Sequence, residues 1–189
     1  MPIPLGVLAV AGASGAPAAA FDLLQTTLIS TNTASVVFDN LGTLAAGYRH
    51  LQIRYTARSD GSGSNTISIR SNNRSAGNYA THHLRGNGSA VQASASTFAG
   101  QIDMAFAMTT NTSGTDRFGA GIIDILDFSS SSKNFVLRSL NGVVDTSVGN
   151  FINLRSGLSP FAEALTRIDL ISNGNFVAGS RFSIYGIRG

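Results

Sequence analysis

The sequence contains no cysteine and few charged residues. Without cysteine, neither a disulfide framework nor a metal site with thiolate ligands can form. Charged side chains make up 12% of the chain, about half of the share that is usual in soluble domains. Lys133 is the only lysine and Glu163 the only glutamate. Because exposed helix surfaces are normally filled with Glu, Lys and Gln, the chain has little material for helices.

The formal net charge of +3 comes from arginines that are spread singly along the chain. A protein that follows the phosphates of a nucleic acid carries its basic residues in patches, so we expect no nucleic-acid partner. Single arginines suit protein–protein contacts instead, because the planar guanidinium group pairs or stacks at low cost.

The segment 4–22, PLGVLAVAGASGAPAAAFD, is apolar and carries no charge before Asp22. A secretory signal needs a positive segment ahead of its apolar core, but the first basic residue is Arg49. Glycines and prolines interrupt the apolar run, which argues against a membrane span. We therefore expect residues 1–22 to form an extended assembly arm that packs on neighbouring protein, with packing on its own domain as the alternative. The arm residues expected to make these contacts are Leu5, Val7, Leu8, Val10 and Phe21.

After the arm, apolar and polar residues alternate with the period of two that half-buried strands show. In segment 49–58, Leu51, Ile53 and Tyr55 share one face with Ala57. Strands are predicted at 23–30, 34–39, 49–58, 66–70, 79–85, 101–108, 118–128, 135–140, 150–155, 166–172 and 180–187. Asn-Gly pairs at 87–88, 141–142 and 173–174 predict turns.

Only the segment 159–165, SPFAEAL, has a helical pattern, with Ser159 as a cap and Glu163 completing a capping box. Short strands without alternating helices predict that residues 23–189 form one all-β domain, an antiparallel jelly-roll-like β-sandwich. In its closing strand we expect Phe182 and Ile184 to point inward, and Arg181 and Ser183 outward.

No motif supports catalysis, a cofactor or a metal, so we expect the protein not to be an enzyme. His82 and His83 are adjacent, and neighbours in a strand point to opposite faces, so they do not readily grip one ion together. Asp124 and Asp127 diverge for the same reason and make a poor carboxylate pair for glycoside hydrolysis. Four tyrosines offer rings for stacking on sugars or for the core, namely Tyr48, Tyr55, Tyr79 and Tyr185.

Two segments carry a family resemblance: SVVFDNLGTLAAGYRHLQIRYTAR at 35–58 and GNFVAGSRFSIYGIRG at the C-terminal end. Together with the Asn78-Tyr79 pair in an Asn-rich region and the apolar Gly/Ala-rich start, they resemble small β-rich structural proteins of tailed bacteriophages. The resemblance covers both ends and the region up to residue 85, and it implies a virion protein with a jelly-roll fold.

The resemblance implies a non-enzymatic subunit displayed on the tail, as a fibre or tail-tip component, attached through its N-terminal arm. A head decoration, cement or head-fibre protein is the alternative. Expected partners are other virion proteins and further copies of the chain, with a trimer as the first choice. A carbohydrate-binding module that recognises the host surface is the rival from another class.

Overall fold

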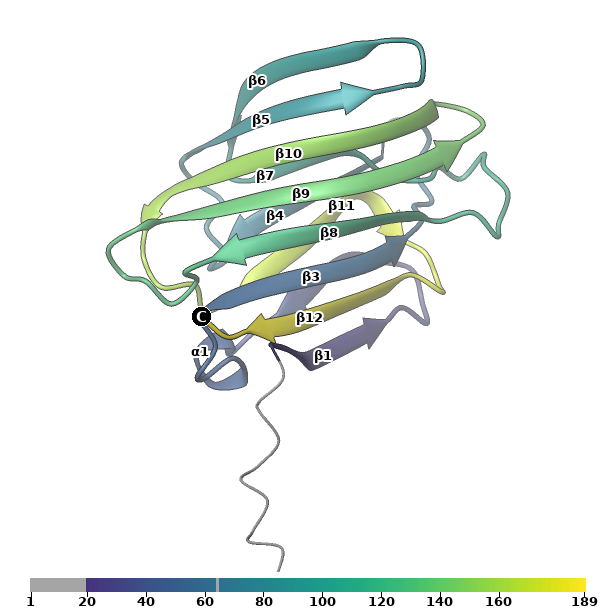
Figure 1. The fold of residues 1–189 in the computed structure, drawn as a ribbon. Coiled ribbons are helices and arrows are strands. Elements are labelled where there is room, and N and C mark those ends of the chain that lie inside the picture. The colour runs from purple at the N-terminus through teal and green to yellow at the C-terminus, as the bar shows by residue number, and fades with distance from the viewer. Residues whose placement is uncertain (1–19, 64) are drawn as a thin grey trace, which may run out of the picture.

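Two antiparallel β-sheets pack face to face in the computed structural model, which describes residues 20–63 and 65–189 (Figure 1). The large sheet has eight strands, in the spatial order β1 (Phe21–Leu28), β12 (Arg181–Ile187), β3 (His50–Ala57), β8 (Gly119–Leu126), β9 (Asn134–Asp145), β10 (Gly149–Ala162), β5 (Asn78–Gly86) and β6 (Val91–Ala99). The small sheet has four, in the order β2 (Thr33–Phe38), β11 (Ile168–Phe176), β4 (Asn65–Ser71) and β7 (Ile102–Met108). The predicted all-β sandwich is confirmed.

The chain passes back and forth between the two sheets. The orders β1-β12-β3-β8 and β2-β11-β4-β7 resemble the paired Greek keys of a jelly roll. The hairpins β9–β10 and β5–β6 then extend the large sheet beyond β8. As a result the large sheet has twice as many strands as the small one, and the β5–β6 hairpin forms its far rim in Figure 1.

The core lies between the sheets and follows the predicted alternation. Leu51 and Ile53 are fully buried, as are Phe182 and Ile184 on the neighbouring closing strand. The Phe182 ring lies 4.7 Å from that of Phe176, centroid to centroid, in an edge-to-face arrangement that aromatic pairs favour. The inward positions predicted for both strands are therefore confirmed.

The outward positions of the closing strand differ in exposure. Arg181 is exposed, as expected. Ser183 lies on the same outward side but is only 7% exposed; it stands between Thr26 of β1, whose hydroxyl lies 2.8 Å from its own, and Arg54 of β3.

The helix expected at 159–165 is wrong, because β10 continues to Ala162. Phe161 packs edge-on against the ring of Tyr79, and Glu163 accepts two hydrogen bonds of 2.6 Å from Arg74. The ion pair with Arg74 uses the Glu163 side chain that a capping box would need, and the tertiary contacts override the local helical pattern. The described helix, α1 (Leu41–Leu44), lies elsewhere and buries Leu41 in the core.

One of the three Asn-Gly turns is confirmed. Asn87 and Gly88 connect β5 and β6, and Gly88 has a positive φ of 89°. Asn141 instead lies within β9, where its amide group donates to the backbone oxygen of Phe106 at 2.8 Å. The pair at 173–174 lies within β11, in a stretch where the pairing register shifts. Strand β6 was not predicted, because its small polar residues show no hydrophobic alternation.

Of the expected arm, Leu5, Val7, Leu8 and Val10 lie outside the described residues. Phe21 lies inside them as the first residue of β1, where it pairs with Ile187 of β12. The ordered sheet therefore begins before residue 23. Within the described part of the chain, no helix is long and apolar enough to cross a membrane.

Candidate functional site

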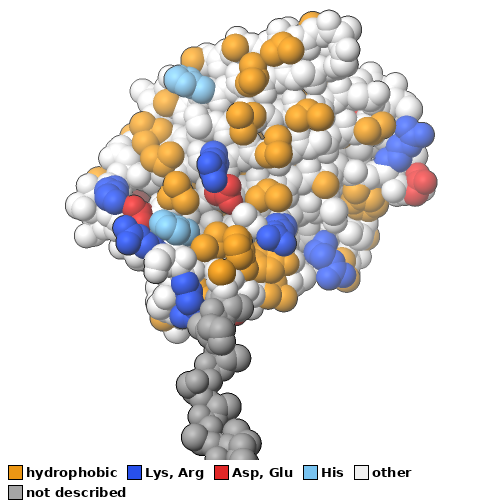
Figure 2. Space-filling model, in the orientation of Figure 1, with side chains coloured by type: hydrophobic (Ala, Val, Ile, Leu, Met, Phe, Trp, Pro, Cys, Tyr) orange, Lys and Arg blue, Asp and Glu red, His pale blue; other side chains and the backbone are white. Residues whose placement is uncertain are grey.

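The outward side of the large sheet is apolar. Thirteen large hydrophobic side chains are exposed in the described parts of the chain, and all of them belong to strands of this sheet. Figure 2 shows hydrophobic side chains spread over the face that the large sheet turns to the viewer. Nine of them lie together on β5, β8, β9 and β10, and we call this group the outer patch: Leu84, Ile122, Leu126, Val136, Leu140, Val144, Ile152, Leu154 and Leu158.

Register places these side chains in rows across the strands. Leu84 pairs with Leu154, which pairs with Leu140, which in turn pairs with Ile122. Directly opposed side chains in a sheet lie about 4.5–5.5 Å apart at Cβ and touch. The row is therefore a continuous aliphatic ridge across four strands.

The outer patch is large for a surface that water alone covers. Its nine side chains are between 39% and 65% exposed. Together they present roughly 800 Å², whereas the largest apolar patch of a monomeric protein is typically about 300–600 Å². A standard protein interface buries about 800 Å² on each partner, so the patch has the size of one half of such an interface.

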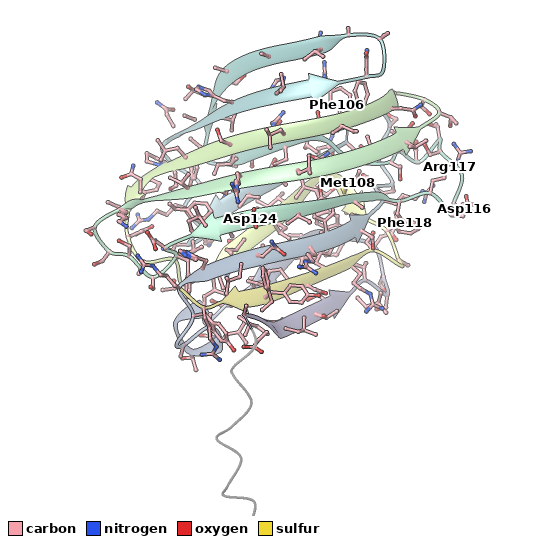
Figure 3. All side chains as sticks on the ribbon, in the orientation of Figure 1. Phe106, Met108, Asp116, Arg117, Phe118 and Asp124 are labelled. Atoms are coloured by element: carbon pink, nitrogen blue, oxygen red, sulfur yellow. The ribbon has the colours of Figure 1, made fainter. Side chains whose placement is uncertain are left out.

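A polar chain crosses the same face beside the ridge. Arg138 pairs with Asp124 at 3.1 Å, and Gln52 donates to the other Asp124 carboxylate oxygen at 2.7 Å. Arg54 donates to Gln52 at 2.7 Å and lies 4.8 Å from the ring centroid of Tyr185. Asp124 is labelled on β8 in Figure 3. Asp124 neutralises Arg138 within this polar chain, whereas Arg54 binds the uncharged Gln52 and keeps its positive charge.

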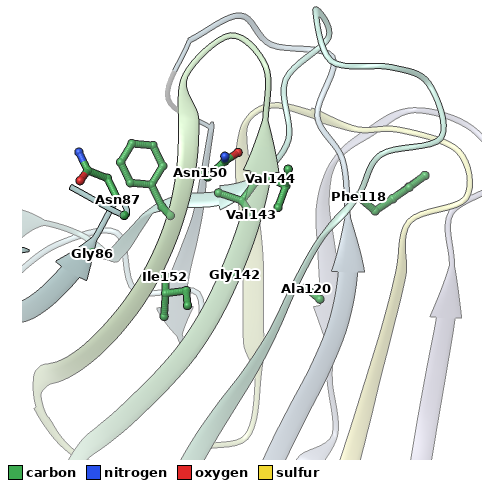
Figure 4. Close-up of a pocket in the computed structure, with 11 residues that line it drawn as sticks. Gly86, Asn87, Phe118, Ala120, Gly142, Val143, Val144, Asn150 and Ile152 are labelled. Carbon is green, nitrogen blue, oxygen red and sulfur yellow. The ribbon is translucent and has the colours of Figure 1, made fainter. Parts of the chain in front are cut away.

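At one end of the face, small residues leave a groove with a volume of about 560 Å³ (Figure 4). Gly86, Gly142 and Ala120 occupy one row of the sheet and form its floor, while Phe118 and Ile152 contribute walls. The groove has no charged side chain in its lining. Such a surface suits an apolar side chain of a protein partner.

The structure separates the histidines and aspartates, as the strand pattern predicted. His82 is exposed on the outer face, whereas His83 lies on the inner side, 3.4 Å from the guanidinium group of Arg155. Burial, and then the charges of Arg155 and Arg85, lower the pKa of His83. These positions give the two imidazoles separate surroundings.

Asp124 and Asp127 have different partners. Asp124 belongs to the polar chain of the outer face. Asp127 follows β8 and forms ion pairs with Lys133 at 2.6 Å and Arg49 at 2.9 Å, and these hydrogen bonds lower its pKa to about 2. Both carboxylates are engaged in ion pairs on the surface, and no group of three or more potential metal ligands occurs among residues 20–63 and 65–189.

The tyrosines do not form an exposed stacking platform. Tyr55 and Tyr79 are buried in the core. Tyr48 donates to Asp22 at 2.7 Å, and the guanidinium group of Arg188 lies 4.6 Å from its ring centroid. Tyr185 lies partly covered on the outer face beside Arg54.

The residues of the outer patch were missed by the sequence analysis. A usable pattern is present in β9, whose segment FVLRSLNGVV is apolar at both phases of the strand period. Such segments are typical of strands that are covered on both faces. In this strand Leu137 is buried and Leu140 is 53% exposed. The isolated subunit therefore covers one face of the strand and leaves the other face open.

Comparison of the chain with protein-family models, curated proteins and solved structures finds no match in any of the three.

Proposed function

We propose that the protein is a non-enzymatic structural subunit of a bacteriophage virion, which assembles through the outer patch of its large sheet. The observation that carries the proposal is the gathering of all exposed large hydrophobic side chains of residues 20–63 and 65–189 on the strands of one sheet. Exposure of this apolar surface to water is unfavourable, and its burial in an interface stabilises the assembly by about 25 cal/mol for each Å². The resemblance to phage structural proteins supplies the biological setting.

The first partner is a further copy of the chain. Within the outer patch, the ion pair of Arg138 and Asp124 balances the charges, so this part of the face does not select a partner of opposite charge. An interface depleted in lysine and glutamate but containing arginine has the composition that interface cores favour. The resemblance to phage proteins favours a threefold arrangement, with the outer patches facing the axis. The tail is the proposed place of the trimer, with attachment through residues 1–20 to other virion proteins.

The oligomeric state of the purified full-length chain tests the interface. We expect concentration-dependent self-association by analytical ultracentrifugation, with a trimer as the species that the outer patch forms. Leu140→Arg places a charge in the middle of the ridge and is expected to weaken assembly at least tenfold, since a buried unpaired charge is costly. The control is Ser35→Arg, at an exposed position of the small sheet. A monomeric wild-type chain, or equal effects of the two variants, contradicts the proposed interface.

Purified particles test the virion role. We expect the protein in phage particles by mass spectrometry, and labelled antibody is expected on the tail. Label on the capsid would favour the decoration or head-fibre alternative. Deletion of residues 1–20 is expected to leave a folded sandwich that fails to join the particle. Absence of the protein from particles contradicts the proposal, and normal incorporation of the deleted form contradicts the role of the arm.

A host-surface glycan is a further ligand to test, because a tail protein meets the host. The nine side chains of the outer patch are all aliphatic, so assembly is the better-supported use of this surface. Binding of oligosaccharides to the trimer would place the glycan site elsewhere on the subunit.

A further inference from the structure

The outermost strand of the large sheet, β6, has a bare edge. Among residues 20–63 and 65–189, its only neighbour in the sheet is β5, and the pairing runs without a register shift from Asn78 opposite Ala99 to Gly86 opposite Val91. The sequence VQASASTFA contains neither proline nor a charged residue. A regular edge strand of this kind presents a row of backbone N–H and C=O groups that another strand can pair with.

The other sheet edges carry features that hinder such pairing. Edge strand β1 contains Asp22 and a register shift near Leu23. Edge strand β7 contains Asp103, has a shifted register against β4, and bears Phe106 at a positive φ of 57°. Edge strand β2 has only six residues. Bulges, charges and short length are the usual protections of an edge, and β6 lacks all three.

The position of β6 adds to its accessibility. Residues Val91 to Ala95 are exposed at every position, so this half of the strand is open on both faces. The hairpin turn is well formed, because the Asn87 side chain accepts hydrogen bonds from the backbone amides of Ser89 and Ala90 at 3.0 and 2.7 Å. Figure 1 shows the hairpin at the rim of the sandwich, with the outer side of β6 open. The edge is thus ordered and unobstructed.

We propose that β6 pairs antiparallel with β6 of a second copy of this chain, about a twofold axis that passes between the two Ala95 residues. This register aligns all nine residues of the strand. It sets Ala93 opposite Thr97 of the second copy and Ser94 opposite Ser96, so the pairs around the centre are small and no like-charged side chains meet. The pairing joins two large sheets into one and brings Val91, which is 72% exposed, toward the edge of the other copy.

This contact goes beyond the proposed function and uses a different surface from the outer patch. A strand from an unrelated protein would satisfy the same backbone groups. The second copy is favoured because the strand is neutral and is compatible with itself in the full-length antiparallel register.

The cysteine-free sequence allows a direct test in the full-length protein. Residues opposed in an antiparallel pair have Cα atoms about 4.5–5.5 Å apart, within the range that a disulfide spans. Ala95→Cys is therefore expected to give a disulfide-linked dimer under mild oxidation. The control is Ser131→Cys, an exposed position after β8. Cross-linking of Ala95→Cys no faster than the control overturns the proposal.

A charge pair tests the register. Ala93→Lys alone is expected to weaken the β6 contact at least tenfold, because Ala93 lies opposite Thr97 near the centre of the contact and a lysine on an edge strand hinders pairing. Adding Thr97→Glu is expected to restore it, since each introduced lysine then faces the introduced glutamate of the other copy. Measurement of the dimer by analytical ultracentrifugation in the Leu140→Arg background separates this contact from the outer patch. If the double variant does not recover the dimer, pairing between copies in this register is overturned. Loss of the trimer through Leu140→Arg alone is expected to leave the β6 dimer intact.

Discussion

The two faces of the large sheet are both apolar, but only one of them is covered. The inner face packs on the small sheet and buries residues such as Leu137 and Ile125. The outer face carries Leu140 and Ile122, which are 53% and 40% exposed. The same strands therefore supply a core on one side and a surface on the other. Burial on the inner side stabilises the fold, whereas the outer side is available to stabilise an assembly.

The outer face of the small sheet shows the usual alternative. There Arg167 pairs with Asp169 at 2.6 Å, and Ser68 donates to Asp103 at 3.1 Å. No large hydrophobic side chain is exposed on the four strands of the small sheet in the described residues. The outer face of the small sheet is therefore polar, and the exposed apolar surface is specific to the large sheet.

Two leucines on β9 give the largest expected difference between the inner and outer faces. Leu137→Ala removes a side chain that is 1% exposed and is expected to cost about 2–5 kcal/mol of unfolding free energy. Leu140→Ala, on the outer face, is expected to cost less than about 1 kcal/mol in the monomer. Urea unfolding at low protein concentration measures both values. Equal losses would mean that the outer face is already covered within the subunit.

Two glycines sharpen the same comparison. A Cβ at Gly121 would point to the inner side of the sheet, 2.5 Å from the hydroxyl oxygen of the buried Tyr55. Gly121→Ala is therefore expected to destabilise the fold by about 1–3 kcal/mol. At Gly142, in the groove of the outer face, the nearest atom would be 3.9 Å away, and Gly142→Ala is expected to leave thermal unfolding nearly unchanged. A large loss at Gly142 would contradict the open groove.

Acid unfolding tests an anchor at the inner side of β9. Burial alone would raise the pKa of Asp145, but hydrogen bonds from Ser113 and from the backbone amides of Ser147, Thr110 and Val148 outweigh it and lower the pKa to about 2. Because the folded-state pKa lies below the ordinary value, the carboxylate stabilises the fold at neutral pH. This contribution is lost as the pH falls from about 5 through about 2.

Asp145→Asn is expected to remove about 2 kcal/mol at pH 7 and to flatten the stability curve below pH 5. Chemical unfolding as a function of pH measures the effect. A variant whose stability stays parallel to that of the wild type down to pH 2 would show that the anchor does not titrate as argued.

The smallest effect is expected for the polar chain of the outer face. Arg138 is 68% exposed at its side chain, so the ion pair with Asp124 is screened by water. Arg138→Ala is expected to change the unfolding free energy of the monomer by less than about 1 kcal/mol. In the assembled protein the loss is expected to be larger, because Asp124 then becomes an unpaired charge at the interface. Equal small effects on folding and assembly would place Arg138 outside the contact.

Much of the fold follows from local pattern. The strict alternation in segment 49–58 predicts β3 and its buried Leu51, Ile53 and Tyr55, because successive side chains of a strand must point to opposite faces. The closing strand is predicted for the same reason. The same pattern does not predict strand β6, because its alanines and serines differ too little in hydrophobicity to show an alternation. The helical pattern of segment 159–165 gives a wrong prediction, because Glu163 accepts a hydrogen bond from Arg74 instead of from a backbone amide.

The candidate surface was less accessible to sequence reasoning. Strand β9 contains the apolar residues Leu137, Leu140 and Val144. The sequence pattern does not distinguish the residue that packs on the second sheet from those that remain exposed. The sequence by itself determined the all-β class, through period-two alternation and the scarcity of Glu and Lys. Only the tertiary structure decided which apolar residues are core and which are surface. The physical reason is that the large sheet has eight strands with two apolar faces, and a single small sheet covers one of them.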